Sequence, residues 1–262
     1  MKLAVIPTWQ RNDSELWKSE SEIDLWLAQS DGIQMALTHL VENHFDYAVS
    51  MHKRSMKGDY IILDNSIVEL GAAMSFGQVL QAATMISADE VVLPDVFYDS
   101  AATKQRVEET LDDYGKPDFK YMAVCHAENL DEFMNLFNWL NANDYIDTIG
   151  IPKCGLKDGT TREMVLNRIM MNRTADDKPI HLLGANGPES FRLPRKWREM
   201  IRSIDTVYPL WMAQHEEVLF PDTTSIKRPE GMVLHDTLGW REGNKTLYGM
   251  NNVAIVKGWL ND

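Results

Sequence analysis

Short apolar runs alternate along the chain with longer segments in which apolar residues recur every three or four positions. A short run bounded by polar residues predicts a buried strand, and the longer periodicity predicts an amphipathic helix. The predicted strands lie at 2–6, 46–50, 59–64, 89–94, 120–125, 146–151, 179–183 and 203–208, and the predicted helices at 76–86, 100–114, 130–141, 161–172 and 194–201. Strands that alternate with helices favour parallel βαβ units. The pattern therefore predicts an α/β fold, a (β/α)8 barrel of the TIM type.

The predicted barrel accounts for most of the chain. A length of 262 residues is ordinary for one barrel domain. We expect residues 1–211 to supply the barrel strands and most helices, and 212–262 to form an irregular C-terminal extension of loops with a closing helix at 251–260. The N-terminal segment 1–7 is better explained as a first strand than as a signal peptide.

Composition narrows the class of protein. With 44% hydrophobic and 25% charged residues and a mean hydropathy of -0.31, the chain is typical of globular proteins without a membrane partner. Its two cysteines, Cys125 and Cys154, form no Cys-x-x-Cys pair, which excludes a disulfide framework and a four-cysteine zinc site and favours a reducing cytoplasm. A net charge of -13 argues against indiscriminate nucleic-acid binding, so any such role requires a local basic patch.

Polar residues stand at the predicted ends of the strands. Because chemistry in such barrels is located where strands end and loops begin, these residues form one candidate site. They are Asp64, Asn65, Asp95, Cys125, His126, Gly150, Gly184 and Asp205. Three carboxylates on one rim indicate either cation binding or catalysis.

Asp64 and Asp205 together match the requirement for retaining substitution at a sugar carbon, in which one carboxylate attacks and the other handles protons. At the separation of about 5 Å that is typical of this mechanism, two charges repel by about 3 kcal/mol, or roughly two pKa units. One carboxyl of such a pair can therefore stay protonated near neutral pH.

Six segments carry a resemblance to a known family. They are Leu63-Asp64-Asn65-Ser66, Leu93-Pro94-Asp95-Val96, Ala123-Val124-Cys125-His126, Thr148-Ile149-Gly150-Ile151-Pro152, His181-Leu182-Leu183-Gly184-Ala185-Asn186-Gly187-Pro188-Glu189 and Ser203-Ile204-Asp205-Thr206-Val207-Tyr208-Pro209. In this order they resemble motifs of the tRNA-guanine transglycosylases, and especially of the shorter relatives that insert 7-deazaguanines into phage and bacterial DNA. The resemblance extends from about residue 59 to 211.

The resemblance implies a role for each strand end. Asp64 corresponds to the family's general acid/base in Ser-Asp-Ser-Gly-Gly, and Asp205 to its nucleophile in Met-Phe-Asp-Cys-Val-Leu-Pro. Asp95 corresponds to the aspartate that reads the base, and Gly150 to a loop that frames it. The implied substrate-binding residues are Asp95, Asn65, Ser66, Cys125, His126, Gly150, Ile151 and Gly184, with Cys125 and His126 lining the pocket rather than catalysing.

The resemblance implies a base-exchange transglycosylase that replaces guanine in nucleic acid with a 7-deazaguanine, with no redox cofactor, ATP or metal. The chain departs from the family where Ser66-Ile67 replaces a glycine pair, where a glutamine is absent from the third motif, and where the C-terminal Cys-x-Cys-x-x-Cys zinc module is missing. The missing module favours DNA over tRNA. The expected partners are this nucleic acid and a guanine or 7-deazaguanine base, and a homodimer is left open. The expected location is the cytoplasm, or the host cytoplasm if a phage encodes the protein.

A basic segment precedes the proposed nucleophile. It contains Arg192, Arg195, Lys196, Arg198 and Arg202, against the single acid Glu199. Local fields extend about a Debye length, so this segment can hold a polyanion despite the acidic whole. Lys53, Arg54 and Lys57 are candidates for the other side. A base in a duplex has to be flipped out to reach a barrel pocket.

Two other functions fit the same residues. One is a metal-dependent phosphodiesterase or hydrolase in which Asp64, Asp95 and Asp205 bind Mg²⁺ or Mn²⁺ through oxygen. The other is a non-catalytic barrel that binds a nucleotide or a nucleic acid.

Overall fold

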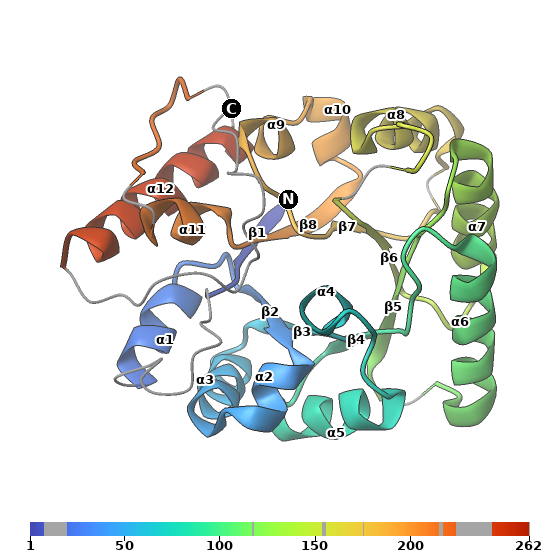
Figure 1. Cartoon of the computed structure of the whole chain (residues 1–262), viewed down its shortest axis with the longest axis horizontal. Coiled ribbons are helices and arrows are strands. Elements are labelled where there is room, and N and C mark those ends of the chain that lie inside the picture. Colours follow the sequence, from blue (N-terminus) through green and yellow to red (C-terminus); the bar gives the residue numbers. More distant parts are fainter. Residues whose placement is uncertain are drawn as a thin grey trace.

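The computed structural model describes residues 1–7, 20–116, 118–153, 156–174, 176–214, 217–223 and 243–261. Within them, eight parallel strands form a nearly closed TIM barrel in the order β1-β8-β7-β6-β5-β4-β3-β2 (Figure 1). The strands are β1 (Lys2–Val5), β2 (Ile33–Leu37), β3 (Tyr60–Asp64), β4 (Glu90–Val92), β5 (Lys120–Val124), β6 (Thr148–Ile151), β7 (Ile180–Leu182) and β8 (Ile201–Thr206). The predicted fold class is confirmed. Cys154 lies outside the described residues.

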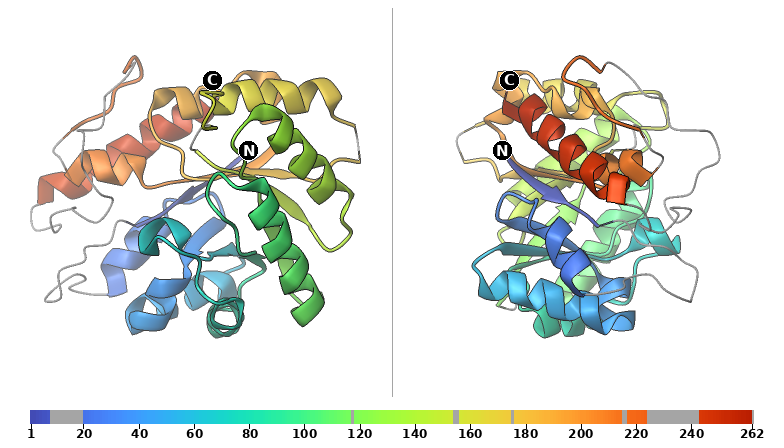
Figure 2. Two further views of the ribbon diagram at one scale, coloured as in Figure 1. Left: turned by 45° about the vertical axis from the view of Figure 1, so that its right-hand side comes forward. Right: turned by 90° about the vertical axis from the view of Figure 1, so that its left-hand side faces the viewer.

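Helices surround the ring of strands in the views of Figures 1 and 2, except α4, which lies within the ring in the view of Figure 1. The described helices are α1 (Glu20–Leu27), α2 (Thr38–Asn43), α3 (Phe45–Met56), α4 (Ile67–Leu70), α5 (Phe76–Ile86), α6 (Ser100–Tyr114), α7 (Leu130–Ala142), α8 (Arg162–Asn172), α9 (Pro188–Phe191), α10 (Arg195–Arg198), α11 (Tyr208–Gln214) and α12 (Gly243–Asn261). Buried residues of all eight strands join those of the helices in one hydrophobic core. Among the described helices, none combines the length and the apolar character that a membrane crossing requires.

The prediction of a strand at 46–50 is wrong. These residues belong to α3, which buries Tyr47, Ala48 and Met51 on one side, at helical spacing. The missing strand is β2, whose apolar run is interrupted by the polar Gln34. Gln34 is nevertheless fully buried, because its amide donates to the Leu27 carbonyl at 2.9 Å and to the Asp59 carboxylate at 2.7 Å. A buried polar residue whose side-chain nitrogen is hydrogen-bonded inside the protein therefore concealed the strand.

The helix predicted at 194–201 is also much shorter than expected. Only Arg195–Arg198 form α10, and the chain enters β8 at Ile201. The other four predicted helices match α5, α6, α7 and α8 to within a residue or so. The closing helix expected at 251–260 is part of the longer α12, which packs on α11. Much of the predicted irregular extension lies outside the described residues.

The barrel closes between β1 and β2 through the residues that precede β2. The Asp31 amide donates to the Leu3 carbonyl at 2.8 Å, and the Val5 amide donates to the Ser30 hydroxyl at 2.9 Å. The register then pairs Leu37 with Asp64 on one side of this junction and Ala4 with Asp205 on the other. Asp64 and Asp205 therefore face the same, carboxy-terminal end of the barrel.

Candidate active site

Six strands contribute residues to the carboxy-terminal mouth of the barrel. Asp64 is the last residue of β3, Asp205 is the penultimate residue of β8, and Asp95 follows β4. His126 follows β5, Gly150 lies in β6, and Gly184 follows β7. The structure thus brings together residues that the sequence holds more than a hundred positions apart.

Asp205 is held by two donors on β7 and the turn that follows it. Its Oδ1 accepts a hydrogen bond from the Gly184 amide at 3.0 Å and lies 3.0 Å from the Nε2 of His181. Gly184 has a φ of 62°, a left-handed conformation that glycine adopts without strain and that turns its amide toward the carboxylate. The described residues make no hydrogen bond to Oδ2 of Asp205. One oxygen is therefore fixed while the other remains available.

Asp95 has both oxygens engaged. Oδ1 accepts from the Asn65 amide at 2.7 Å, and Oδ2 lies 2.8 Å from Nε2 of His126. Asn65 also donates to the Leu93 carbonyl, and the edge of Phe97 contacts the His126 ring, with a centroid separation of 5.2 Å. Asp95 therefore holds Asn65 and His126 in place at the mouth. A bound nucleobase would have to share the oxygens of Asp95 with these two residues.

Asp64 occupies a different environment. Its Oδ2 accepts from the Ser66 amide at 2.7 Å, and Ser66 has a φ of 62°, which is uncommon for a residue with a side chain. Burial, followed by the negative charges of Glu69, Asp95 and Asp205, raises the pKa of the Asp64 carboxyl well above its usual range. The protonated form of Asp64 is therefore favoured, and this carboxyl is suited to proton transfer.

Glu69 is a fourth carboxyl of the site, which the sequence did not reveal. It lies on α4, within the ring of strands in the view of Figure 1. Val68 and Leu70 on either side are 57% and 52% exposed, whereas Oε2 of Glu69 is buried without a hydrogen-bond partner. Burial and the charge of Asp205 raise the pKa of Glu69 to about 7. No motif marked it, because an acidic residue in a four-residue helix usually faces solvent.

His181 is the second residue whose role the sequence did not reveal. In the sequence it is only the first residue of the segment 181–189. In the structure it is fully buried in β7 and faces Asp205. A signal was present in the register: polar residues at His181, Ser203 and Asp205 occupy alternate positions on neighbouring strands. Residues two apart on a strand point to the same face.

Three of the predicted substrate-binding residues have clear packing roles. Cys125 is buried and donates from its thiol to the Phe133 carbonyl of α7 at 3.4 Å, so it faces the helical layer, and burial raises the pKa of the thiol. A Cβ on Gly150 would come within 2.9 Å of a Leu183 side-chain atom and 3.2 Å of one of Val124, so any larger residue would have to displace these side chains. Ile151 is buried in the same strand.

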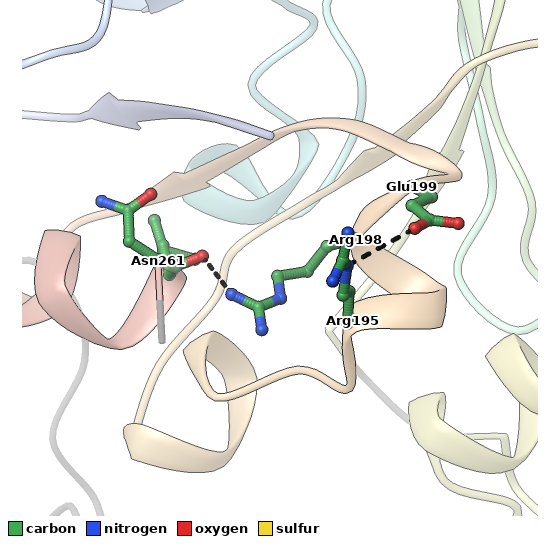
Figure 3. Close-up of a pocket in the computed structure, with 5 residues that line it drawn as sticks. Arg195, Arg198, Glu199 and Asn261 are labelled. Carbon is green, nitrogen blue, oxygen red and sulfur yellow. Dashed lines mark hydrogen bonds and ion pairs between the residues drawn. The ribbon is translucent and has the colours of Figure 1, made fainter.

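The basic segment does not border the mouth. α10 leads directly into the amino-terminal end of β8, at the end of the barrel opposite Asp205. An open depression of about 380 Å³ lies there, lined by Arg195, Arg198, Glu199, Leu260 and Asn261. Figure 3 shows how Arg195, Arg198, Glu199 and Asn261 lie around it. Arg198 donates to the Leu260 carbonyl and Arg195 pairs with Glu199 at 3.7 Å. Arg192 lies over the Trp259 ring at 4.6 Å, and Lys196 lies beside Trp197.

Arg202 is separated from the rest of the basic segment. Its guanidinium enters the amino-terminal end of the barrel. There it pairs with the fully buried Glu90 at 2.8 Å and donates to Thr148 at 2.9 Å. Arg54 likewise lies before the amino-terminal end of β3 and pairs with Asp59 at 3.8 Å, with Lys53 and Lys57 exposed beside it. The predicted cationic surface and the carboxylates are thus at opposite ends.

Within the described residues, no three His, Cys, Asp or Glu side chains are grouped so that they could hold a metal ion. The oxygens of Asp95 are already bonded to Asn65 and His126, and Oδ1 of Asp205 to Gly184 and His181. This geometry gives no support to the metal-dependent phosphodiesterase. Comparison with known protein families and with curated proteins finds no match for this chain.

Proposed function

We propose that this protein is a base-exchange transglycosylase that replaces a guanine in nucleic acid, preferentially DNA, with a 7-deazaguanine. The observation that carries the proposal is the contrast between Asp64 and Asp205, two carboxyls that interact across one barrel mouth. Asp64 is buried among other acids in an environment that favours its proton, whereas Asp205 is oriented by His181 and Gly184. Carboxyls with such different environments are suited to acid and nucleophile roles.

The chemistry follows from this division. Oδ2 of Asp205 attacks C1′ of the nucleotide, the bond from C1′ to the base breaks, and Asp64 donates a proton to the departing guanine. The incoming base then loses a proton to Asp64 and attacks C1′ from the opposite face, which releases Asp205. One glycosidic bond is exchanged for another with retention, so the exchange consumes no cofactor.

Glu69 supports the same assignment. Its charge contributes to the raised pKa of Asp64, and its own carboxyl titrates near neutral pH. A second proton-holding group beside Asp64 increases the fraction of the site that has a proton available for the leaving base. Asp95 and His126, paired at 2.8 Å at the mouth, are the polar groups that we assign to the heterocycle, and a bound nucleobase would share their hydrogen bonds.

The nucleic acid has to be held by other cations than those of α10. Lys153 is exposed two residues after β6, and its Cβ is 3.7 Å from the position that a Cβ on Gly184 would take. Arg162 donates to the Leu183 carbonyl at 3.0 Å in the same region. These two residues bring positive charge to the mouth itself, where a flipped nucleotide would present its phosphates.

The decisive experiment incubates the protein with duplex DNA, single-stranded DNA or tRNA together with labelled guanine or a 7-deazaguanine. Label that enters the polymer, together with a covalent adduct that wild type forms and Asp205→Asn does not, supports the proposal. Absence of label with every base and polymer would contradict it. Activity that EDTA abolishes would instead favour the metal-dependent hydrolase.

A further inference from the structure

A series of hydrogen-bonded polar side chains, most of them buried, connects the amino-terminal end of the barrel to Asp205. It runs from Glu90 to Arg202, Ser203, His181 and finally Asp205. The successive distances are 2.8, 3.3, 2.8 and 3.0 Å. Glu90, His181 and Ser203 are fully buried, so their polar atoms depend on neighbouring groups for hydrogen bonds, whereas the Arg202 side chain is 24% exposed.

A bulge in β8 makes this series geometrically feasible. Ile180 pairs with Ile201 and His181 pairs with Ser203, so Arg202 is an extra residue without a counterpart on β7. Consecutive side chains on a regular strand point to opposite faces, and a bulge relaxes that alternation. Arg202 and Ser203 can therefore both reach the interior, which an unbulged strand would prevent.

The donors and acceptors fix the direction of every bond. An arginine guanidinium only donates, so Ser203 Oγ accepts from the Nε of Arg202. Among the residues that the structure describes, the hydroxyl has one other partner, Nδ1 of His181, and it donates to this nitrogen. His181 then carries its hydrogen on Nε2 and donates it to Oδ1 of Asp205. The opposite arrangement would leave the Ser203 proton buried without an acceptor, which costs about 1 to 3 kcal/mol.

We propose that Arg202 and Ser203 on one side, and Asp205 on the other, fix the Nε2-hydrogen tautomer of His181 and that His181 is a positioning residue for Asp205. The fixed Nε2 hydrogen, together with the Gly184 amide, holds Oδ1 and turns Oδ2 toward the mouth. The positioning role rests on the proposed function, because it takes Asp205 as the nucleophile. The tautomer itself does not rest on it. Arg202, which the sequence suggested as a phosphate contact, acts from the far end of the barrel.

Nitrogen NMR of the histidine rings tests the tautomer without any assay of activity. The chain has seven histidines, and the His181→Gln variant identifies the signals of His181. At neutral pH we expect wild-type His181 to show hydrogen on Nε2 and a hydrogen-bonded, unprotonated Nδ1. In Ser203→Ala the hydrogen should stay on Nε2, because Asp205 still accepts it, but Nδ1 should lose its hydrogen bond and its signal should shift to that of an unbonded ring nitrogen. A hydrogen on Nδ1 in the wild type, or an unchanged spectrum in Ser203→Ala, would overturn the proposal.

Ser50→Ala is the matched control. Ser50 is also a fully buried serine, on α3, but its hydroxyl has no hydrogen-bond partner among the described residues. The two variants lose the same atom, and only Ser203→Ala breaks the series that leads to Asp205. Ser50→Ala should therefore leave the His181 signals unchanged.

Base-exchange kinetics then test the positioning role. Ser203→Ala should lower kcat by on the order of ten- to a hundredfold, with a smaller change in KM, because a misplaced nucleophile affects the chemical step. His181→Gln retains an amide donor toward Asp205 and should keep more activity than His181→Leu. Wild-type kcat in His181→Leu would refute the positioning role. Absence of exchange in the wild type would refute the proposed function instead, and the NMR result would still decide the tautomer.

Discussion

Buried charges are paired with opposite charges at one end of the barrel and grouped with like charges at the other. At the amino-terminal end, Arg202 meets Glu90 at 2.8 Å and lies over the Tyr60 ring at 5.3 Å, so opposite charges compensate each other. At the carboxy-terminal end, the carboxyls of Asp64 and Glu69 are buried close to further acids, and their pKa values are raised. Compensated charge maintains a fold, whereas accumulated like charge costs stability and is typical of functional sites. The difference indicates that the carboxy-terminal end is the better candidate for a functional site.

The largest loss of activity is expected from a substitution at the carboxy-terminal mouth. Asp205→Asn should lower base exchange by at least about 10⁴-fold, because an amide cannot form the glycosyl intermediate. Label incorporation into DNA measures the rate, and circular dichroism checks the fold. Retention of substantial exchange by this variant would mean that the nucleophile is another residue, and Asp64→Asn is the next variant to test.

At the opposite end, Arg202→Met should affect stability strongly. It leaves the fully buried Glu90 without its cation, which typically costs about 3 to 5 kcal/mol. Denaturant unfolding measures the loss. The double variant Arg202→Met, Glu90→Leu should recover most of it, because no uncompensated charge remains.

Arg195→Met provides the matched surface control for the arginine substitution. The Arg195 side chain is 88% exposed, and its ion pair with Glu199 should contribute little. We expect a change in the free energy of unfolding within about 0.5 kcal/mol. A loss as large as that of Arg202→Met would remove the distinction between buried and exposed arginines on which the comparison of the two ends depends.

Glu69→Gln should stabilise the protein above neutral pH. Because the pKa of Glu69 is raised from 4.5 in the unfolded chain to about 7 in the folded protein, the folded state binds the proton more tightly. Stability therefore falls as the pH rises from 4.5 to about 7 and is level above that. Removing this titration should add up to about 3 kcal/mol at pH 8 and little near pH 4.5.

Unfolding free energies of wild type and Glu69→Gln across this pH range provide the measurement. The gap between the two curves should open between pH 4.5 and 7, which a general packing improvement would not produce. Val68→Ala, at the exposed neighbour on the same helix, should shift the curve equally at every pH. A constant gap for Glu69→Gln would show that its carboxyl is not buried against Asp205.

The sequence anticipated the architecture because strand and helix periodicities are local. Four helices and seven strands follow directly from them, and the strand-end rule places Asp64, Asp95 and Asp205 at one mouth. β2 was missed because Gln34 is polar, yet its side-chain nitrogen donates to Leu27 and Asp59, which are neighbours that only the fold supplies. Local patterns cannot report partners that are distant in the chain.

The same limit explains the errors of placement at the candidate site. Arg202 was grouped with Arg195 and Arg198 because they are close in sequence, but a bulge turns it into the barrel while the others stay outside. Glu69 and His181 were overlooked because their importance lies in burial beside Asp205. Residues that are close in the sequence can lie at opposite ends of the barrel, because each strand runs to the carboxy-terminal end and each helix returns. The charges along the sequence therefore do not show at which end they lie.

The smallest effect concerns the nucleic acid itself and tests which end it contacts. Lys153→Ala, at the mouth, should weaken DNA binding and reduce the slope of log K against log salt by about 0.9, the value for one lost phosphate contact. Arg195→Ala, at the far end, should leave the slope unchanged. Titration of labelled DNA at several salt concentrations compares the two variants. If Arg195→Ala reduces the slope and Lys153→Ala does not, DNA binds at the amino-terminal end, and a flipped base could not reach Asp205 through the mouth.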